Sequence, residues 1–483
     1  MLMGIVLEKE TVSLRRAEPP MANDPRDIAV WALEDRNGNV SKRLAQLLDR
    51  NSPGPADRAL ARELALGVCR RRSTVRALLR AFMDDPDRRL PGVISEILMV
   101  GAYQLVFLDR IPDHAAINEA VEQAARHRHK RQGGMVNGVL RTIARKVGEA
   151  VEEPAPLKRK AIPIDAGRHC MSDRPIFPDP AHDPTGYLAA AHSMPMPLAS
   201  RWLTEFGSLG VAAEIASHAN TRAPMILRVS PLADPSGDTA AAVEAVLASL
   251  REDGVEACRH ENGRSVVLPR GSQFGELRAF REGWAQVQDP TATAVVDAAE
   301  VRPGMRVLDF CAAPGTKTTH IAEELRGEGE IVALDVSQDK LGRIEENCGR
   351  LGHTNVRTML AEQAGSLEPE SFDAVLADVP CTNTGVLARR AEARWRFSSK
   401  SLERAVRDQR DLMALAARFV RPGGRFVYST CSIEPEENSG AVAWMAERAA
   451  GFELLHEKLT LPGGATSPER WRDGGYCAVF RRR

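Results

Sequence analysis

Two cysteines stand at the ends of two apolar runs late in the sequence. Cys431 follows the run that contains Phe426, Val427 and Tyr428, within "RFVYSTCSIEPEENSG". Cys381 follows a similar run in "FDAVLADVPCTNTG". An ionised thiol is a nucleophile that can form transient covalent bonds, whereas a buried thiol can also be purely structural. The repeated arrangement favours chemistry at the ends of two neighbouring strands.

A tight turn between an apolar run and a helical pattern is the second chemical candidate, "VLDFCAAPGTKTTHIAEEL" (307–325). Such a turn can hold a ligand at the helix N-terminus. Asp335 ends the next apolar run, where a carboxylate can accept hydrogen bonds from both hydroxyls of a ribose. Because Gly315 is the only glycine of the turn, a pyrophosphate fits poorly, and a nucleoside such as S-adenosylmethionine fits better. A purely structural turn is the alternative.

Strand and helix patterns alternate around both candidates. The expected strands are "RVLDF" (306–310), "EIVALDV" (330–336), "NVRTML" (355–360), "FDAVLADV" (372–379) and "RFVYST" (425–430). Helical patterns lie between them, for example after Ser337, which is a plausible N-cap. This alternation predicts an α/β doubly wound parallel sheet with its site at the C-terminal ends of the strands.

The chain divides into five segments. Residues 1–25 lack a clear period, and we expect a flexible extension. Residues 26–147 form an all-α pattern, and residues 148–185 are rich in proline and charge, which is typical of a linker. Residues 186–285 indicate a small α+β middle domain, and residues 286–483 carry the doubly wound pattern.

Charge is distributed unevenly along a chain whose formal net charge is zero. Residues 26–150 contain 22 Lys and Arg against 15 Asp and Glu, a surplus of seven, so the remainder has a deficit of seven. A basic module beside an acidic one indicates a polyanion-binding accessory domain. The basic clusters 70–72 and 126–131 are either RNA contacts or solvated helix faces.

Bulk features exclude several classes of protein. No run reaches the roughly 18 apolar residues of a transmembrane helix, and the N-terminus lacks a secretory signal. The eight cysteines contain no CxxC pair, so neither a zinc site nor a disulfide framework is indicated. We therefore expect a cytoplasmic protein without membrane or metal.

Three sequence blocks resemble a known family. "DFCAAPGTKTTHI", "ADVPCTNTGVLARR" and "YSTCSIEPEENS" resemble the signature blocks of RNA (cytosine-5) methyltransferases of the NOL1/NOP2/Sun family. The helical front end, with "MVNGVLRTIAR" (135–145), resembles a NusB-like RNA-binding domain. The combination is similar to the bacterial branch that methylates a cytosine of 16S ribosomal RNA. The resemblance covers residues 26–483 apart from the linker, and implies a Rossmann-like class I methyltransferase domain, S-adenosylmethionine as cofactor and ribosomal RNA as partner of a monomer.

The chemistry of this family requires an activated cytosine. Carbon 5 of cytosine is a poor nucleophile until a thiolate adds to carbon 6. The residues alone do not decide which thiol attacks, because a Pro-Cys pair like that of DNA cytosine methyltransferases would favour Cys381. In the RNA family the nucleophile is the cysteine of the Thr-Cys pair. The resemblance therefore implies Cys431 as nucleophile and Cys381 in product release, with Asp378 at the base and the methyl donor and Lys317 near both.

The resemblance also implies a set of cofactor-binding residues: Cys311, Ala312, Ala313, Pro314, Gly315, Thr316, Lys317, Asp335, Glu362 and Asp378. The sequence departs from the family at three positions. Thr316 stands where a second glycine is usual, Pro290 replaces an alanine, and Glu362 replaces an aspartate after the third strand. Glu362 could still meet the adenine amine, although its extra methylene changes the geometry.

The segment "ARRAEARWRF" (388–397) follows Cys381. A target base must leave its stack to reach a thiol, and the flanking RNA then needs contacts. The candidates, with a solvated loop as the alternative, are Arg389, Arg390, Arg394, Trp395 and Arg396. Three other functions compete with the main interpretation: the same reaction on tRNA or another ribosomal site, a non-catalytic RNA-binding or antitermination factor, and a nicotinamide-dependent oxidoreductase.

Overall fold

A computed structural model describes residues 24–34, 39–449 and 451–483. The chain forms two compact units. The helical unit contains residues 24–222 and 387–399, and the sheet unit contains residues 223–386 and 400–483. Within the described ranges, no helix is long and apolar enough to cross a membrane. Up to residue 23, the extension expected over residues 1–25 lies outside the described residues.

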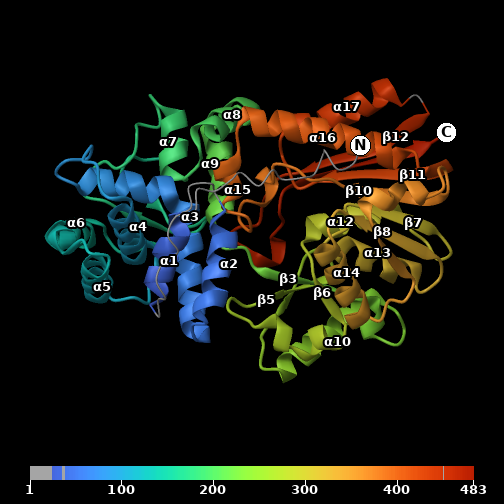
Figure 1. Ribbon diagram of the computed structural model, residues 1–483, viewed down its shortest axis with the longest axis horizontal. Helices are drawn as coiled ribbons and strands as arrows, with labels where there is room; N and C mark the ends of the chain where they lie inside the picture. The colour runs from blue at the N-terminus through green and yellow to red at the C-terminus, as the bar shows by residue number, and fades with distance from the viewer. Residues whose placement is uncertain (1–23, 35–38, 450) are drawn as a thin grey trace. The chain divides into compact units, whose positions relative to one another are not determined.

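The helical unit buries one apolar core. Its helices are α1 (Pro25–Leu33), α2 (Val40–Asn51), α3 (Pro55–Phe82), α4 (Gly92–Phe107), α5 (Asp113–Arg126), α6 (Gly133–Lys146), α7 (Pro184–Ala191), α8 (Met196–Phe206), α9 (Leu209–Asn220) and α15 (Ala393–Arg396), and most run from blue to green in Figure 1. The side chain of Asp24 accepts the N–H of Arg26, and Pro25 opens α1; both features favour a helix start. The all-α pattern of residues 26–147 is confirmed.

Arg71, in the middle of a predicted basic cluster, is a core residue. It breaks the regularity of α3 with φ −104° and ψ 15°. Its guanidinium is buried and donates to the carbonyl oxygens of Ile164 and Asn220. Burial lowers the pKa of Arg71 to about 9. The prediction that the cluster 70–72 contacts RNA is therefore wrong for Arg71, which holds neighbouring chain segments together.

Residues 387–399 complete the helical unit, although they follow the strand that carries Cys381. Arg394 is fully buried, and burial lowers its pKa to about 9. Its guanidinium donates over 2.8–3.2 Å to three carbonyl oxygens and one side-chain oxygen, those of Arg70, Ser193, Ala219 and Asn220.

Trp395, beside Arg394, donates its indole N–H to the carbonyl oxygen of Cys69 at 2.8 Å. The prediction that Arg394 and Trp395 meet RNA is therefore wrong, because their polar groups are engaged inside the helical unit. Arg389, Arg390 and Arg396 are exposed, so for these three the RNA contact stays a prediction.

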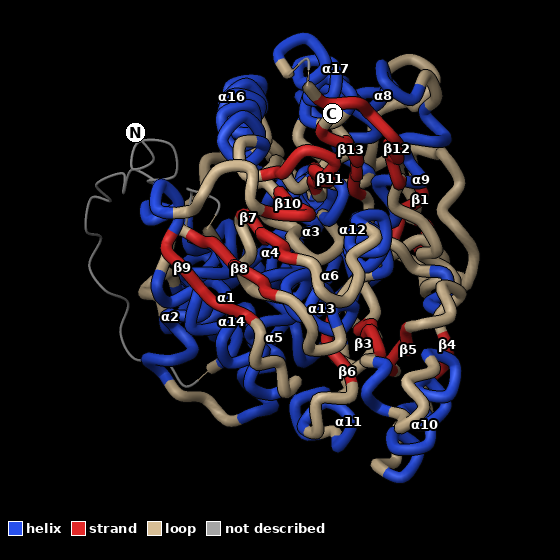
Figure 2. The backbone as a smooth tube through the Cα atoms, turned by 90° about the vertical axis from the view of Figure 1, so that its right-hand side faces the viewer, coloured by secondary structure: helices blue, strands red, loops and turns tan. Residues whose placement is uncertain are grey.

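The sheet unit is built on a seven-stranded sheet in the order β12-β13-β11-β10-β7-β8-β9. Its strands, drawn red in Figure 2, are β7 (Arg306–Phe310), β8 (Glu330–Asp335), β9 (Val356–Leu360), β10 (Phe372–Asp378), β11 (Val420–Thr430), β12 (Phe452–Thr460) and β13 (Gly475–Arg482). Strands β9 to β11 of this order pair in parallel, whereas β13 and β12 pair antiparallel. The five predicted strands are confirmed.

Helices cover both faces of this sheet, as Figure 1 and Figure 2 show. On one face lie α12 (Pro290–Ala299), α13 (Thr316–Leu325) and α14 (Gln338–Arg350), and on the other α16 (Ser399–Ala417) and α17 (Ser439–Arg448). Ser337 precedes α14 as predicted, although its side chain makes no capping hydrogen bond. The α/β doubly wound fold is confirmed, with β12 and β13 as an unpredicted antiparallel addition.

A smaller antiparallel sheet, in the order β4-β5-β3-β6, belongs to the same unit. Its elements are β3 (Met225–Val229), β4 (Cys258–Arg259), β5 (Ser265–Leu268) and β6 (Ala285–Val287), with α10 (Thr239–Glu252) and the short α11 (Arg278–Arg281). Arg228 of β3 donates two hydrogen bonds to Glu323 of α13, at 2.7 and 3.1 Å, and both side chains are fully buried. Arg228 also donates to the carbonyl oxygen of Thr316 at 3.1 Å, so this sheet is fastened to the first turn of α13.

The two units divide the chain differently from the expected segments. The predicted middle domain, 186–285, is split, because α8 and α9 belong to the helical unit and β3 to β6 to the sheet unit. The predicted linker, 148–185, contains the paired strands β1 (Ala161–Pro163) and β2 (His169–Met171), and its apolar residues Ile162 and Phe177 are buried. Proline and charge alone do not distinguish a linker from an ordered surface loop.

Candidate active site

The two predicted thiols lie together in the sheet unit. Strands β10 and β11 are parallel neighbours, with Asp378 opposite Ser429, so the residues that follow them meet at the same edge. Cys381 Sγ lies 3.0 Å from Cys431 Sγ. Both thiols are free and partly buried.

Hydrogen bonds distinguish the two sulfurs. Cys431 Sγ–H donates to Asn383 Oδ1 at 3.3 Å, which leaves Cys381 to donate toward the Cys431 sulfur. The hydrogen bond to Cys431, together with burial and the negative charge of Glu437, raises the pKa of Cys381 well above its usual range. Cys381 therefore stays a neutral thiol. Asn383 has φ 61°, a left-handed conformation that asparagine tolerates better than most residues, and sequence reasoning did not single it out.

Lys317 and Asp378 form an ion pair at the end of β10. Lys317 Nζ donates to Asp378 Oδ2 at 2.6 Å, and Ser429 Oγ donates to Asp378 Oδ1 at 2.7 Å. Burial lowers the pKa of Lys317, but the charge and the hydrogen bond of Asp378 outweigh burial and hold this pKa above its usual value. Lys317 thus carries a positive charge beside the thiols and is not a solvated helix-surface lysine.

Asp335 closes the turn that links β7 to α13. Its Oδ2 accepts the N–H of Ala313 at 3.1 Å, and its Oδ1 accepts the N–H of Val336 at 2.7 Å. Lys340 Nζ lies 3.3 Å from the same carboxylate. A carboxylate offers about four lone-pair positions, so these contacts leave acceptor capacity for a ribose. The turn and Asp335 are thus brought together as predicted from their spacing.

The backbone of the turn explains two of the three departures from the family pattern. Gly315 has φ 95°, and a Cβ there would lie 3.1 Å from Ile344 Cα, so glycine is required. Thr316 is already the first residue of α13, where a side chain is tolerated. Pro290 opens α12 after the capping residue Asp289, and proline is favoured at this helix position.

Glu362 and the residues beneath the turn complete the predicted set. Glu362 is exposed in the 3₁₀ helix 361–366 that follows β9, and its expected contact with an adenine amine stays a prediction. Asp309 lies buried below the turn and accepts a 2.6 Å hydrogen bond from Thr318. Burial raises the pKa of Asp309 to about 7 and also raises the pKa of Cys311. Both groups are therefore largely protonated structural neighbours of the site.

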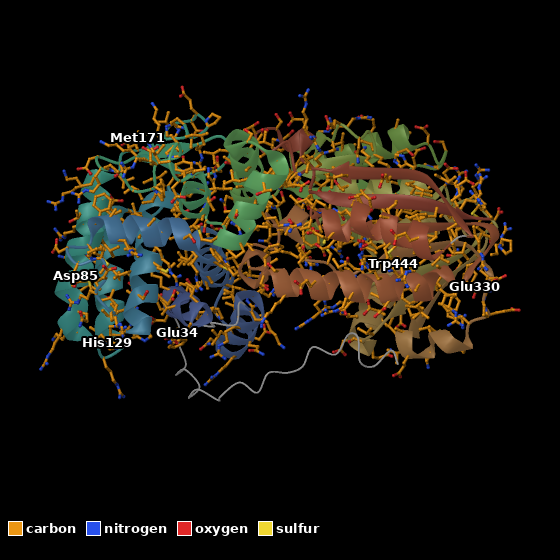
Figure 3. The ribbon with its side chains drawn as sticks, turned by 90° about the horizontal axis from the view of Figure 1, so that it is seen from above. Glu34, Asp85, His129, Met171, Glu330 and Trp444 are labelled. Atoms are coloured by element: carbon orange, nitrogen blue, oxygen red, sulfur yellow. The ribbon has the colours of Figure 1, made fainter. Side chains whose placement is uncertain are left out.

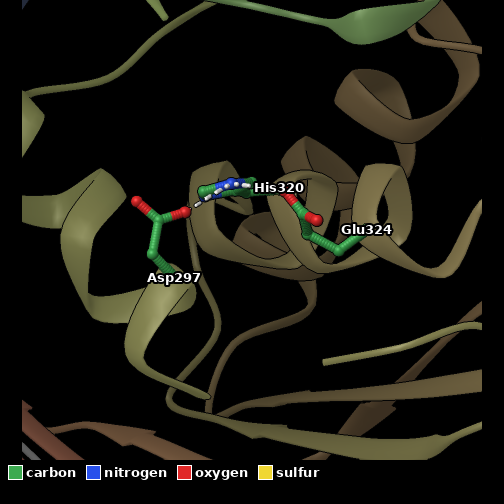
Figure 4. Close-up of side chains that lie close together, drawn as sticks. All are labelled: Asp297, His320 and Glu324. Atoms are coloured by element: carbon green, nitrogen blue, oxygen red, sulfur yellow. Dashed lines mark ion pairs between the residues drawn. The ribbon is translucent and has the colours of Figure 1, made fainter. Parts of the chain in front are cut away.

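Asp297, His320 and Glu324 form a group in which one ligand atom from each residue lies within 4.8 Å of the others (Figure 4). His320 Nε2 is 3.6 Å from Asp297 and 3.4 Å from Glu324. Arg264 donates to both carboxylates, at 2.9 Å to Glu324, so a cation already neutralises them. Burial lowers the pKa of His320 to about 3. The group is best explained as an ion-pair network between α12 and α13.

Two family models match the sequence. The model of the 16S rRNA methyltransferase RsmB/F family matches residues 297–471, which contain the thiols, the Lys317–Asp378 pair and the turn. The NusB family model matches residues 23–145 at the front of the helical unit.

Relatives match across most of the chain. Ribosomal RNA small subunit methyltransferase B of Pectobacterium carotovorum is 32% identical over 424 residues, which cover 87% of this chain and 88% of the relative. The probable ribosomal RNA small subunit methyltransferase B of Bacillus subtilis is 30% identical over 435 residues, with 89% of each chain covered.

Solved structures share the fold. The crystal structure of PH0851 covers 97% of this chain and 100% of its own, with a TM-score of 0.69 and 22% identity. The structure of NSun6 from Pyrococcus horikoshii with SFG covers 60% of this chain and 98% of its own, with a TM-score of 0.52 and 22% identity. Given its family models and relatives, the chain belongs to the ribosomal RNA small subunit methyltransferase B family and is an S-adenosylmethionine-dependent methyltransferase.

Proposed function

We propose that the protein methylates carbon 5 of a cytosine in small-subunit ribosomal RNA through a covalent intermediate. The observation that supports this reaction is the pair of thiols, 3.0 Å apart, beside the Lys317–Asp378 ion pair. The names of the relatives in Pectobacterium and Bacillus support the class of RNA. Eight free cysteines suit a reducing cytoplasm, where ribosomal RNA is present.

In this mechanism Cys431 is the nucleophile. A free thiol is only about 3% ionised at pH 7, and forming its thiolate costs about 2 kcal/mol. The ammonium of Lys317 interacts electrostatically with Cys431 and attracts the thiolate. Bond formation between Cys431 Sγ and carbon 6 makes carbon 5 nucleophilic. Bound S-adenosylmethionine supplies the electrophilic methyl group.

Cys381 assists the release of the product. After methyl transfer, carbon 5 loses its proton and the bond between carbon 6 and Cys431 Sγ breaks. The neutral Cys381 thiol, held 3.0 Å away, can donate a hydrogen bond or a proton to the departing sulfur. The high pKa of Cys381 suits a donor better than a nucleophile, which supports the assignment of attack to Cys431.

Asp378 and Lys317 orient the base in this proposal. Asp378, held by Lys317 and Ser429, faces the edge where the two thiols meet. A polar group fixed beside the ring nitrogen would stabilise the charge that develops on the ring when the thiolate adds. The cofactor would lie along residues 311–317, with its ribose on Asp335.

Replacing Asp335 with alanine is expected to weaken the affinity for S-adenosylmethionine by about 10- to 100-fold, because hydrogen bonds to a charged group contribute about 1.5–3 kcal/mol. Calorimetric titration of the folded variant measures this loss. Asp339, which lies in the first turn of α14, provides a control, and Asp339→Ala should bind normally. An unchanged affinity in Asp335→Ala would remove the ribose contact from the proposal.

RNA binding by the helical unit is proposed to use the exposed side chains of Arg128, Lys130 and Arg131, next to His129, which Figure 3 labels. Arg126 belongs to the same predicted cluster but is paired with Asp24 and Glu119, so we leave it out.

Reversing all three charges to glutamate is expected to weaken RNA binding at least about tenfold and to reduce the salt slope, by about 0.9 for each lost phosphate contact with duplex. Filter binding at several salt concentrations measures both quantities. The matched control reverses Arg448, Lys458 and Arg481, which are exposed in the sheet unit. Equal losses in both triple variants would indicate a general charge effect rather than this surface.

The function itself is tested with a labelled methyl donor and 16S ribosomal RNA. We expect labelled 5-methylcytidine at one position, and the same position should lack the methyl group in RNA from a strain without the protein. Labelled tRNA would favour the alternative substrate, and absence of transfer to any RNA would contradict the proposal. The oxidoreductase alternative predicts nicotinamide binding instead.

A further inference from the structure

Glu437 is a fully buried carboxylate that contacts both thiol-bearing loops. It ends the 3₁₀ helix Pro435–Glu437 after β11. Its Oε1 accepts the backbone N–H of Thr382 at 2.9 Å and the side-chain amide of Gln409 at 2.8 Å. Its Oε2 accepts the hydroxyls of Thr382 and Ser432.

The partners of this carboxylate adjoin the two thiols in sequence. Thr382 directly follows Cys381, and Ser432 directly follows Cys431. One rigid acceptor therefore holds the residue after each thiol. We propose that Glu437 is a positioning residue that sets the separation of the two sulfurs; this role rests on the proposed two-thiol reaction.

A second layer of hydrogen bonds holds Glu437 itself. Gln409 of α16 also donates to the carbonyl oxygen of Pro380, the residue before Cys381, at 3.0 Å. The hydroxyl of Tyr428 donates to the backbone oxygen of Glu437 at 2.7 Å. The Cys381 loop is therefore tied on both sides of its thiol, and Glu437 has little freedom to move. Buried polar networks of this kind fix a single arrangement when every group is satisfied.

The donors around the two carboxylate oxygens predict which substitutions are tolerated. The groups at Oε1 are N–H donors, which cannot accept a hydrogen bond. The groups at Oε2 are hydroxyls, which can rotate and accept. In Glu437→Gln the amide oxygen can take the Oε1 place and the NH₂ group can face the hydroxyls. In Glu437→Ala all four donors lose their acceptor, so the loops are released.

The first test measures the thiol separation without using the methylation reaction. Diamide oxidises two adjacent thiols to a disulfide and is itself reduced to a hydrazine. In the wild-type protein we expect rapid formation of a Cys381–Cys431 disulfide, measured by peptide mapping. The rate should fall by about 10-fold or more in Glu437→Ala, because misplacement by about 1 Å is enough to lose 10²-fold in proximity effects. Glu437→Gln should recover most of the rate.

The second test measures turnover. Glu437→Ala is expected to lower kcat by about 100-fold with little change in the KM for RNA, since the reacting groups are displaced but RNA contacts remain. Glu437→Gln should restore most of kcat. Glu436→Ala is the control, because Glu436 is an exposed neighbour in the same 3₁₀ helix.

The outcomes separate the two proposals. If Glu437→Ala forms the disulfide as fast as wild type, or if Glu437→Gln is as impaired as Glu437→Ala, the positioning role is wrong. If the wild-type protein forms the disulfide in a Glu437-dependent way but transfers no methyl group to cytosine, the proposed function fails and the positioning role stands. Should Glu437→Ala not fold, Glu437→Gln and Thr382→Val report on the same contacts, and Thr382→Val is expected to slow disulfide formation.

Discussion

Replacing Cys431 with alanine is expected to lower methyl transfer by about four orders of magnitude or more, the scale lost when a covalent nucleophile is removed. The variant keeps the cofactor turn, the Lys317–Asp378 pair and the Cys381 thiol, yet none of these can activate carbon 5 without a bond at carbon 6. Transfer of a labelled methyl group to ribosomal RNA measures the loss, and calorimetry should show unchanged affinity for S-adenosylmethionine.

Cys381→Ala is expected to give a different defect. Addition and methyl transfer can still occur, but the departing Cys431 sulfur lacks its neighbouring donor at 3.0 Å. Covalent protein–RNA adduct should therefore accumulate and be visible as a slowly migrating band on a denaturing gel. Cys258→Ala, which removes an exposed thiol, should behave as wild type. If the adduct persists in the Cys431 variant and disappears in the Cys381 variant, the two roles are exchanged.

Replacing Arg228 with methionine is expected to lower the free energy of unfolding of the sheet unit by about 3–5 kcal/mol, because the Glu323 carboxylate would remain buried without its partner. Both side chains are fully buried, and Arg228 also donates to the first turn of α13. Urea unfolding of the full chain, followed by the tryptophans of the sheet unit, measures the change.

Removing both charges should cost much less than removing one. The double variant Arg228→Met with Glu323→Leu is expected to recover most of the lost stability, since no unpaired charge stays buried. The exposed pair Arg259 and Glu244 offers a control, and Arg259→Met should leave stability almost unchanged. If the single Arg228 variant is as stable as that control, the buried pair does not fasten the smaller sheet to α13.

The central strands and their chemistry could be predicted from the sequence because both follow local patterns. Apolar runs that alternate with helical patterns specify a parallel sheet, and the ends of its strands necessarily bring Asp335, Cys381 and Cys431 to one edge. The antiparallel strands β12 and β13 were missed. Strand β12 is exposed along most of its length and so lacks a clear apolar pattern.

Residues that act through long-range contacts gave no comparable signal. Arg71 and Arg394 resemble surface arginines in sequence, since neither their neighbours nor their spacing shows that backbone carbonyls surround them. Glu437 lies in an acidic, apparently solvated run, and its burial depends on Thr382, which is far away in the chain. Only three-dimensional contacts show that these charges are buried.

The attachment of residues 387–399 to the helical unit has a consequence for biosynthesis. Helices α1 to α9 emerge from the ribosome first, but Arg394, which satisfies carbonyl groups inside them, is made much later. At about 5–20 residues per second, the nascent front half waits on the order of ten seconds for this segment. Its final packing therefore follows translation of most of the polypeptide, and a transcript truncated before this point would leave an incomplete fold exposed to proteases.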